Sequence, residues 1–154
     1  MKRILCVWFP NWPIQRLVVD RPELRCQRIV LFRRDARRGQ IVSAVSPLAM
    51  QDGLAIDMPL SEAKSLLRRA TQVASGAQSI TSSQTDTPFF IFEHEQPADM
   101  AALETLADQL ESFSPIVGLE AVDPIEFKRG RRADSVFLDI TGLAHLFGDE
   151  EQLA

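Results

Sequence analysis

Two aspartates, Asp134 and Asp139, bracket a short apolar segment near the end of this 154-residue sequence. The residues between them, 136–138 (VFL), have the composition of a buried strand. Acidic residues at the ends of such strands hold Mg²⁺ in many phosphoryl-transfer enzymes. The pair is therefore the first candidate for a metal-dependent site.

The spacing of these two aspartates argues against a shared ion. Side chains alternate along a strand, so a separation of five places Asp134 and Asp139 on opposite faces. A metal centre would need a carboxylate from another element, and the natural neighbour is the strand expected at residues 3–9 (RILCVWF). That strand carries no acid, and the next acid along the chain is Asp20. Metal catalysis is doubtful on these grounds.

Other catalytic patterns are missing from the sequence. It contains no Walker loop, no GxGxxG fingerprint and no Ser-His-Asp arrangement. His94 and His145 are isolated, which is typical of surface or structural histidines. Cys6 and Cys26 form no CxxC pair and indicate reduced, buried or half-buried thiols in a cytoplasmic protein. No apolar run approaches the roughly 18 residues of a membrane span, so no membrane contact is expected.

The formal net charge of −4 argues against a surface that coats DNA uniformly. Arginines nevertheless cluster at residues 32–40, 68–69 and 128–132. These clusters are either solvated turns or phosphate contacts on one face of the protein. The DNA-binding candidates are Arg33, Arg34, Arg37, Arg38, Arg129, Arg131 and Arg132.

Hydrophobic periodicity predicts the elements that must position these residues. Strands are expected at 3–9, 28–32, 40–46, 89–93, 115–122 and 135–140. An Arg-rich hairpin turn would join the second and third of these strands. Helices are expected from about residue 12, at 59–70, at 97–113 with Asp99 as its cap, and from 143. Polar residues 75–88 read as a linker. This order predicts an α+β fold with a helix-covered, mostly antiparallel sheet and an inserted subdomain.

Four stretches carry a family resemblance: ILCVWFPNWPIQRL, GQIVSAVSPLAMQDGLAIDMPLSEAKSLL, ESFSPIVGLE and ADSVFLDITGLAHLFG. Their order resembles the N-terminal half of Y-family (translesion) DNA polymerases, and more closely the ImuB-type branch. The resemblance implies a palm-like fold with a small fingers subdomain. The palm would comprise residues 1–27 and 89–154, truncated at its C-terminus. Residues 28–76 would form the fingers and 77–88 a linker.

The resemblance also implies that the metal-binding positions are degenerate. The acidic positions after the first strand fall on Trp8 and Pro10, and the adjacent Asp-Glu pair of the palm falls on Asp134 and Ser135. One of three carboxylates is left, so Asp134 is a weak metal candidate. One carboxylate cannot bridge the two ions of a phosphoryl-transfer centre.

The substrate-binding positions are altered in the same way. By the resemblance, the residue that screens the sugar 2′ position falls on Pro13. The Tyr and Arg that hold the triphosphate fall on Pro47 and Met50, which lack a hydroxyl and a guanidinium. Losing one transition-state contact costs about 2.7–4 kcal/mol, so losing four such groups should abolish polymerisation. The surrounding frame does match the family: Ser46, Ala49, Gly53, Met58 and Pro59.

The expected function is thus a catalytically degenerate, polymerase-like adaptor in SOS-type translesion repair, with no cofactor. Two alternatives stay open. One is an active error-prone nucleotidyltransferase that uses Mg²⁺ through displaced ligands such as Asp139 or Glu120. The other is a DNA-binding module without catalysis. The resemblance implies these partners: a DNA primer-template, an error-prone replicative-type polymerase, a RecA-like accessory protein and the sliding clamp. The protein would be cytoplasmic, and nucleoid-associated when acting.

The aromatic stretch at residues 8–13 allows two interpretations. Trp8, Phe9, Pro10, Trp12 and Pro13 would turn the catalytic floor into an apolar surface. The rings either fill a vacated pocket or form a surface for a partner or for base stacking.

Overall fold

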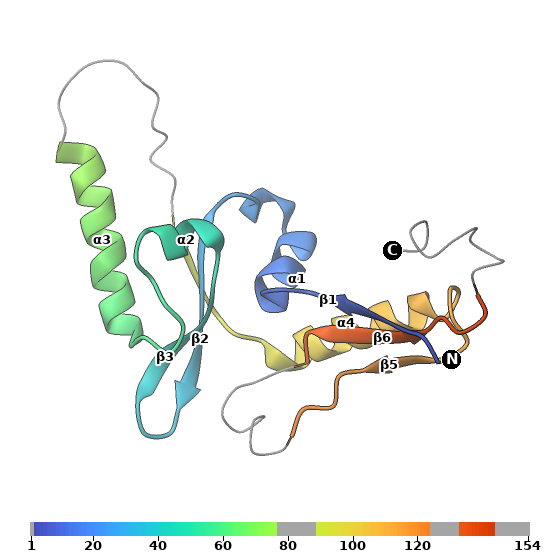
Figure 1. The fold of residues 1–154 in the computed structure, drawn as a ribbon. Helices are drawn as coiled ribbons and strands as arrows, with labels where there is room; N and C mark the ends of the chain where they lie inside the picture. Colours follow the sequence, from blue (N-terminus) through green and yellow to red (C-terminus); the bar gives the residue numbers. More distant parts are fainter. Residues whose placement is uncertain (1, 77–88, 124–132, 144–154) are drawn as a thin grey trace, which may run out of the picture. The chain divides into compact units, whose positions relative to one another are not determined.

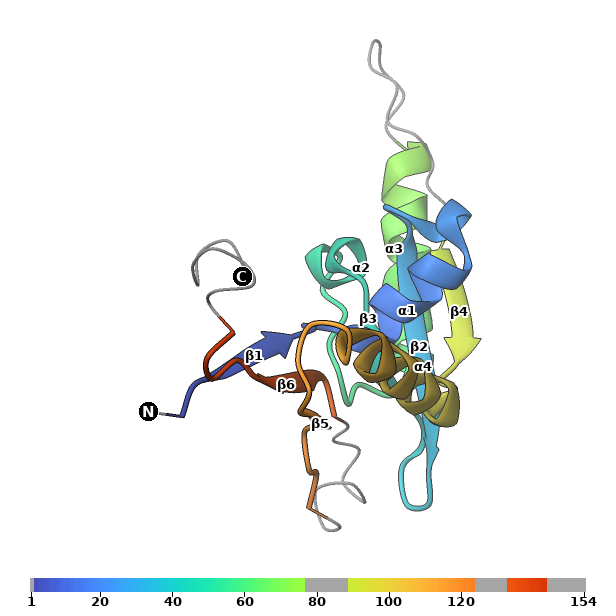
Figure 2. The same cartoon turned by 90° about the vertical axis from the view of Figure 1, so that its right-hand side faces the viewer.

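The computed structural model describes residues 2–76, 89–123 and 133–143, with the side chains of 70–76 excepted. These residues form helices and two three-stranded sheets (Figures 1 and 2), which confirms the predicted α+β class. The chain divides into two compact units. Unit 1 comprises Met1–Trp12 and Gln96–Ala154, and unit 2 comprises Pro13–Glu95. The predicted division into palm, fingers and linker stays a prediction.

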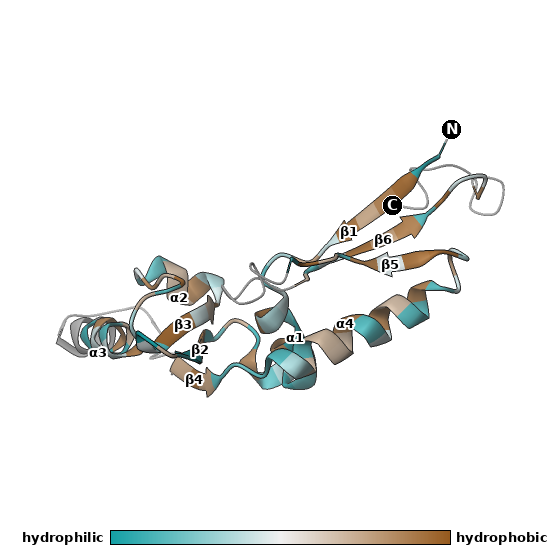
Figure 3. Cartoon of the chain, turned by 90° about the horizontal axis from the view of Figure 1, so that it is seen from below, coloured by the Kyte–Doolittle hydropathy of each residue, from teal (hydrophilic) through white to brown (hydrophobic). Residues whose placement is uncertain are grey.

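Unit 1 is an antiparallel sheet with one helix on it. Its strands β1 (Ile4–Trp8), β5 (Val117–Leu119) and β6 (Ser135–Asp139) lie in the order β1-β6-β5. Helix α4 (Gln96–Leu110) runs along one face of the sheet (Figure 3). The core between them centres on four buried residues, Leu103, Ala133, Val136 and Leu138. The other face of the sheet carries exposed side chains, because residues alternate along β1. Cys6 on this face is exposed, and so is Cys26 in unit 2, so the prediction of buried or half-buried thiols was wrong.

The start of α4 differs from the prediction. The helix begins at Gln96, so Asp99 lies inside the first turn and is buried rather than capping the end. Pro97 explains the shift, because proline fits the first helical positions, where its missing N–H has no intrahelical partner anyway. The helix also ends at Leu110 instead of residue 113.

Unit 2 is a sheet with a core on each face. It contains α1 (Trp12–Asp20), whose first residue belongs to unit 1, the 3-10 turn η1 (Pro22–Leu24), β2 (Arg28–Asp35), β3 (Gly39–Val45), α2 (Pro47–Gln51), α3 (Leu60–Gly76) and β4 (Phe89–Glu93). Strand β2 lies in the middle, antiparallel to β3 and parallel to β4. Val30 packs in the cluster with α2 and α3, whereas Ile29 and Leu31 pack in the cluster with α1. Burial on both faces explains the continuous apolar run in β2.

The Arg-rich segment is mostly strand, where a hairpin turn was predicted. Strand β2 continues through Arg33 and Arg34, which pair with Ile41 and Gln40, so the turn covers only residues 36–38. Asp35 holds that turn, because its Oδ1 accepts the N–H groups of residues 37 and 38 at 2.9 Å each. Helix α3 is likewise longer than predicted and ends at Gly76. The predicted linker from residue 77, the basic segment 128–132 and a helix after 143 lie outside the described residues.

Candidate functional site

Trp8 and Asp134 form a direct side-chain contact in unit 1. The register of β1 and β6 places Trp8 opposite Ser135, and Asp134 comes immediately before β6. The indole Nε1–H of Trp8 donates to Asp134 Oδ2 at 3.1 Å. The Ser135 hydroxyl donates to the other oxygen, Oδ1, at 3.0 Å. Three of the predicted metal-site positions therefore lie together, and they bind one another.

The backbone of Asp134 is also fixed. Its carbonyl accepts the N–H of Phe9 at 2.8 Å, which extends the pairing of the first strand with the last. Its own N–H donates to Glu120 Oε2 at 3.4 Å. Asp134 is thus held through its side chain and its backbone by residues of three segments.

The residues at this site do not fit a two-metal centre. Both oxygens of Asp134 already accept hydrogen bonds from neutral donors. The indole N–H at position 8 can only donate, and Pro10 offers no side-chain ligand atom. Among the residues that the structure describes, no group of three or more His, Cys, Asp or Glu is arranged to hold a metal ion.

Asp139 serves a turn at the other end of β6. Its Oδ1 accepts the N–H of Thr141 at 3.0 Å, and Lys2 Nζ lies 3.8 Å from its Oδ2. The Thr141 hydroxyl and N–H, with Lys2, hold the pKa of Asp139 below its ordinary value. Asp134 and Asp139 therefore have different partners.

The aromatic residues of the stretch 8–13 divide into packed and exposed rings. Phe9 and Trp12 pack against the core of unit 1, with ring centroids 5.3 Å apart. The indole N–H of Trp12 donates to the Asp99 carbonyl at 2.9 Å. Trp8 differs, because 63% of its surface is exposed, so it does not fill a pocket. Pro10 lies in an exposed turn.

The predicted substrate positions in unit 2 lie on short, regular elements. Pro13 is half-buried near the start of α1, Pro47 is the exposed first residue of α2, and Met50 in α2 is 47% exposed. None of these three side chains carries a group that hydrogen-bonds phosphate.

The frame around Pro47 and Met50 is held by one buried hydroxyl. Ser46 is 3% exposed. Its Oγ accepts the N–H groups of Ile29 at 2.9 Å and Ala49 at 3.4 Å, and donates to the Gln27 carbonyl at 2.9 Å. Ser46 thereby caps α2 and joins it to the start of β2.

The candidate DNA-binding arginines of the hairpin lie close to acids. Arg34 lies 3.6 Å from Glu93, and Arg33 lies 3.6 Å from Asp57. Arg38 approaches Asp57 at 3.2 Å, and Arg37 is exposed at the turn. The two N–H groups of the turn and the nearby arginines lower the pKa of Asp35. Arg129, Arg131 and Arg132 lie outside the described residues.

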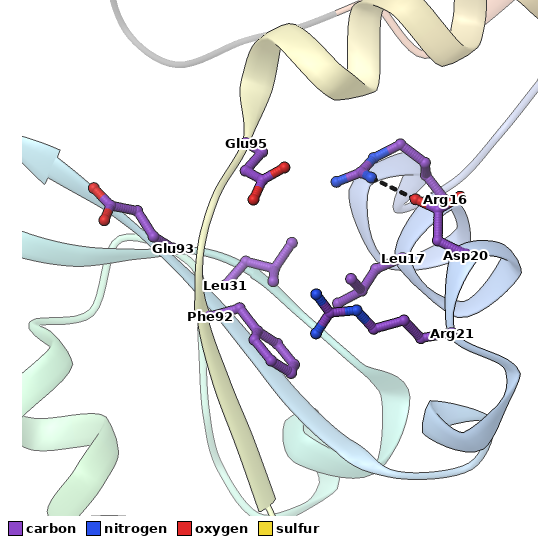
Figure 4. A pocket seen from close by; sticks show the side chains of 8 residues that line it. All are labelled: Arg16, Leu17, Asp20, Arg21, Leu31, Phe92, Glu93 and Glu95. Atoms are coloured by element: carbon purple, nitrogen blue, oxygen red, sulfur yellow. Dashed lines mark hydrogen bonds and ion pairs between the residues drawn. The ribbon is translucent and has the colours of Figure 1, made fainter.

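A hollow in unit 2 was not predicted from the sequence. It has a volume of about 210 Å³ and lies between α1 and the strands β2 and β4 (Figure 4). Arg16 pairs with Asp20 at 2.7 Å, and the guanidinium of Arg21 lies 5.2 Å from the ring centre of Phe92. Glu93 and Glu95 also line it. The two cations face three acids, so the hollow has no excess positive charge for an anion. The i,i+4 spacing of Arg16 and Asp20 was the only signal in the sequence.

Most of this chain matches a known protein family. The model of the impB/mucB/samB family matches residues 7–154. "Protein ImuB" from two strains of Caulobacter vibrioides, NA1000/CB15N and ATCC 19089/CB 15, is 41% identical over 58 residues. That alignment covers 38% of this chain and 10% of the relative, so the chain spans about a tenth of these curated relatives.

Solved structures of DNA polymerases share the fold. A post-insertion binary complex of Dbh DNA polymerase aligns with a TM-score of 0.62 at 15% identity, over 94% of this chain and 33% of that one. DinB from Sulfolobus solfataricus aligns with a TM-score of 0.57 at 15% identity, over 94% and 33%. These matches confirm the predicted fold, an α+β architecture with a palm-like, mostly antiparallel sheet. Across the described residues, no helix is long and apolar enough to cross a membrane.

Proposed function

This chain belongs to the impB/mucB/samB family, and we propose that it is a catalytically degenerate, polymerase-like part of an adaptor in SOS-type translesion DNA repair. The chain spans only a third of the similar polymerase structures, so the adaptor would be the longer protein that contains it. Its proposed partners are a primer-template DNA, an error-prone replicative-type polymerase, a RecA-like accessory protein and the sliding clamp. It would act in the cytoplasm, at the nucleoid, without a cofactor.

The Trp8–Asp134 contact is the observation that carries this proposal. A carboxylate that bridges catalytic ions needs free lone pairs directed at those ions. In this chain the indole of Trp8 donates to one oxygen of Asp134 and Ser135 donates to the other. The remaining acid therefore works as an acceptor within the protein. Phosphoryl transfer depends on positioning and electrostatics, and both would be lost.

Primer extension by the full-length protein tests the proposal. With Mg²⁺ or Mn²⁺, the wild-type protein should incorporate no nucleotide on a primed template. Asp134→Ala is the matched control, since it separates activity of this site from a contaminating polymerase. Incorporation that Asp134→Ala abolishes would favour the alternative, an active nucleotidyltransferase with displaced ligands such as Asp139 or Glu120. Incorporation that Asp134→Ala leaves intact would point to a contaminant.

DNA binding is proposed as a part of this function, and the exposure of Arg34 and Arg37 favours it. Arg34 has 75% of its side chain exposed, although Glu93 lies nearby. Affinity of the full-length protein for primer-template should fall steeply with salt. The double change Arg34→Ala and Arg37→Ala should weaken binding and flatten the salt dependence. Binding that ignores salt would identify the basic clusters as solvated turns.

A further inference from the structure

The face of the unit 1 sheet opposite α4 is ordered in three rows. Strand register aligns residues of β1, β6 and β5 across this face, and two backbone bonds, Glu120 N–H to the Ser135 carbonyl and Asp139 N–H to the Ile116 carbonyl, extend the rows. The rows are Trp8–Ser135–Glu120, Cys6–Phe137–Gly118 and Ile4–Asp139–Ile116.

This open face exposes large apolar side chains. Trp8 is 63% exposed, Ile116 60%, Ile4 52% and Phe137 37%. The space above Gly118 in the middle row is open, because a Cβ placed there would meet no atom within 4 Å. The strands that carry these residues are largely hydrophobic (Figure 3). The face is therefore an apolar surface with Trp8 at one end.

The size of the face limits what can cover it. Three strands about 4.8 Å apart and five residues long span on the order of 250 Å². A stable dimer of ordinary size needs about 800 Å² from each partner. This face alone is too small for a second copy of the chain, but it suits a short peptide segment.

The acidic residues near the open face favour a peptide over a nucleic acid as its ligand. Asp134 and Glu120 lie at the Trp8 end of the face. Unit 1 as a whole contains six Lys or Arg and twelve Asp or Glu, a formal net charge of −6. Carboxylates at this end of the face repel a phosphate backbone and attract a cation.

We propose that the open face, through Trp8, binds a short segment of a partner protein that presents apolar side chains and at least one Lys or Arg. The inference rests on the proposed adaptor function, which requires protein partners. Tryptophan is favoured at binding hot spots. The ring of Trp8 is already oriented by its bond to Asp134, so binding immobilises it at little entropic cost. The Asp134 carboxylate attracts the partner's cation through its charge and need not give up its bonds to Trp8 and Ser135.

The experiment measures peptide affinity with the full-length protein by calorimetry. One probe is a 12-residue amphipathic peptide of Leu and Lys, and its charge-reversed match is a peptide of Leu and Glu. A 20-residue thymidine oligonucleotide is the nucleic-acid probe. Trp8→Ala removes the proposed anchor, and the double change Asp134→Asn with Glu120→Gln removes the charges. Val19→Ala is the matched control, because Val19 is 76% exposed but belongs to unit 2.

The Leu/Lys peptide should bind, and Trp8→Ala should weaken it on the order of tenfold or more, as at a hot spot. The Leu/Glu peptide should bind at least about tenfold more weakly than the Leu/Lys peptide. The charge variant should reduce this difference in affinity, and Val19→Ala should leave both affinities unchanged. Equal affinity of Trp8→Ala and wild type would overturn the inference. So would no saturable Leu/Lys binding below about 1 mM, a Trp8-dependent dimer in sedimentation, or displacement of the peptide by the oligonucleotide. Nucleotide incorporation in the primer-extension assay would refute the proposed function, but it would not alter these peptide affinities.

Discussion

The two units differ in what surrounds the positions that the family resemblance predicts to be degenerate. In unit 2, Pro47 and Met50 lie at the surface of α2, and the Ser46 network beneath them is intact. In unit 1, Trp8 binds the remaining acid, Asp134. In unit 2 the predicted positions have no polar side chain and lie on an ordered frame. In unit 1 two of the predicted positions bind each other directly.

The units also differ in charge. Unit 2 contains eleven Lys or Arg and nine Asp or Glu, a formal net charge of +2, against −6 for unit 1. A net charge of −4 for the whole chain conceals this separation. These charges favour phosphate contact at the hairpin of unit 2 and contact with a cationic partner at unit 1.

A substitution in the Ser46 network of unit 2 should lower the free energy of unfolding more than the other changes proposed below. Ser46→Ala would remove the cap of α2 and leave the Ile29 N–H and the Gln27 carbonyl without their buried partner. Loss of a cap and of buried hydrogen bonds should together cost about 2–4 kcal/mol in the free energy of unfolding. Urea denaturation of the full-length protein measures this cost.

The control for Ser46 is Ser65→Ala. Ser65 is exposed in α3 and donates only to the Ser61 carbonyl, so its loss should change stability by less than about 0.5 kcal/mol. Equal costs for the two serines would contradict the view that unit 2 retains a working frame.

The hydrogen bond between Trp8 and Asp134 should contribute a measurable free energy, smaller than that of the Ser46 network. A double-mutant cycle with Trp8→Phe and Asp134→Ala isolates the hydrogen bond, since Phe keeps a ring and loses the donor. Because the site is partly exposed, the coupling energy should be about 0.5–1.5 kcal/mol. A coupling energy of zero would show that Asp134 does not orient the Trp8 ring. The contrast between the two units would then be lost.

Most elements could be predicted from the sequence, whereas their ends and contacts could not. The apolar run at residues 29–32 predicts a strand, but it cannot show that Arg33 and Arg34 continue the ladder, because that depends on pairing with Gln40 and Ile41. The positions of Trp8 and Asp134 follow from the family resemblance. Their hydrogen bond does not, because it requires the register of two strands 126 residues apart.

Acid should destabilise both units through one aspartate each. The pKa values of Asp35 and Asp139 are lowered by the N–H donors of the hairpin turn and by Thr141, respectively. A lowered folded-state pKa gives stability that is present above the ordinary value, near 3.8, and lost as pH falls through the folded-state pKa. Asp35→Asn and Asp139→Asn should therefore each flatten the fall in unfolding free energy below about pH 4. Their effects should add, because the residues lie in different units. Curves that superimpose on the wild type would refute this.

The smallest effect concerns the ion pair of Arg34 and Glu93. Both side chains are largely exposed and lie 3.6 Å apart, so Glu93→Gln should change stability by less than about 0.5 kcal/mol. Glu93→Gln should raise the affinity for DNA, whereas deletion of an arginine should lower it. The reason is that Glu93→Gln removes an acid beside the hairpin and leaves Arg34 free to approach phosphate. Affinity for primer-template, measured by anisotropy across a salt series, should rise with Glu93→Gln and fall with Arg34→Ala. If neither change alters affinity, the hairpin does not contact DNA, and the charge difference between the units reflects solvation alone.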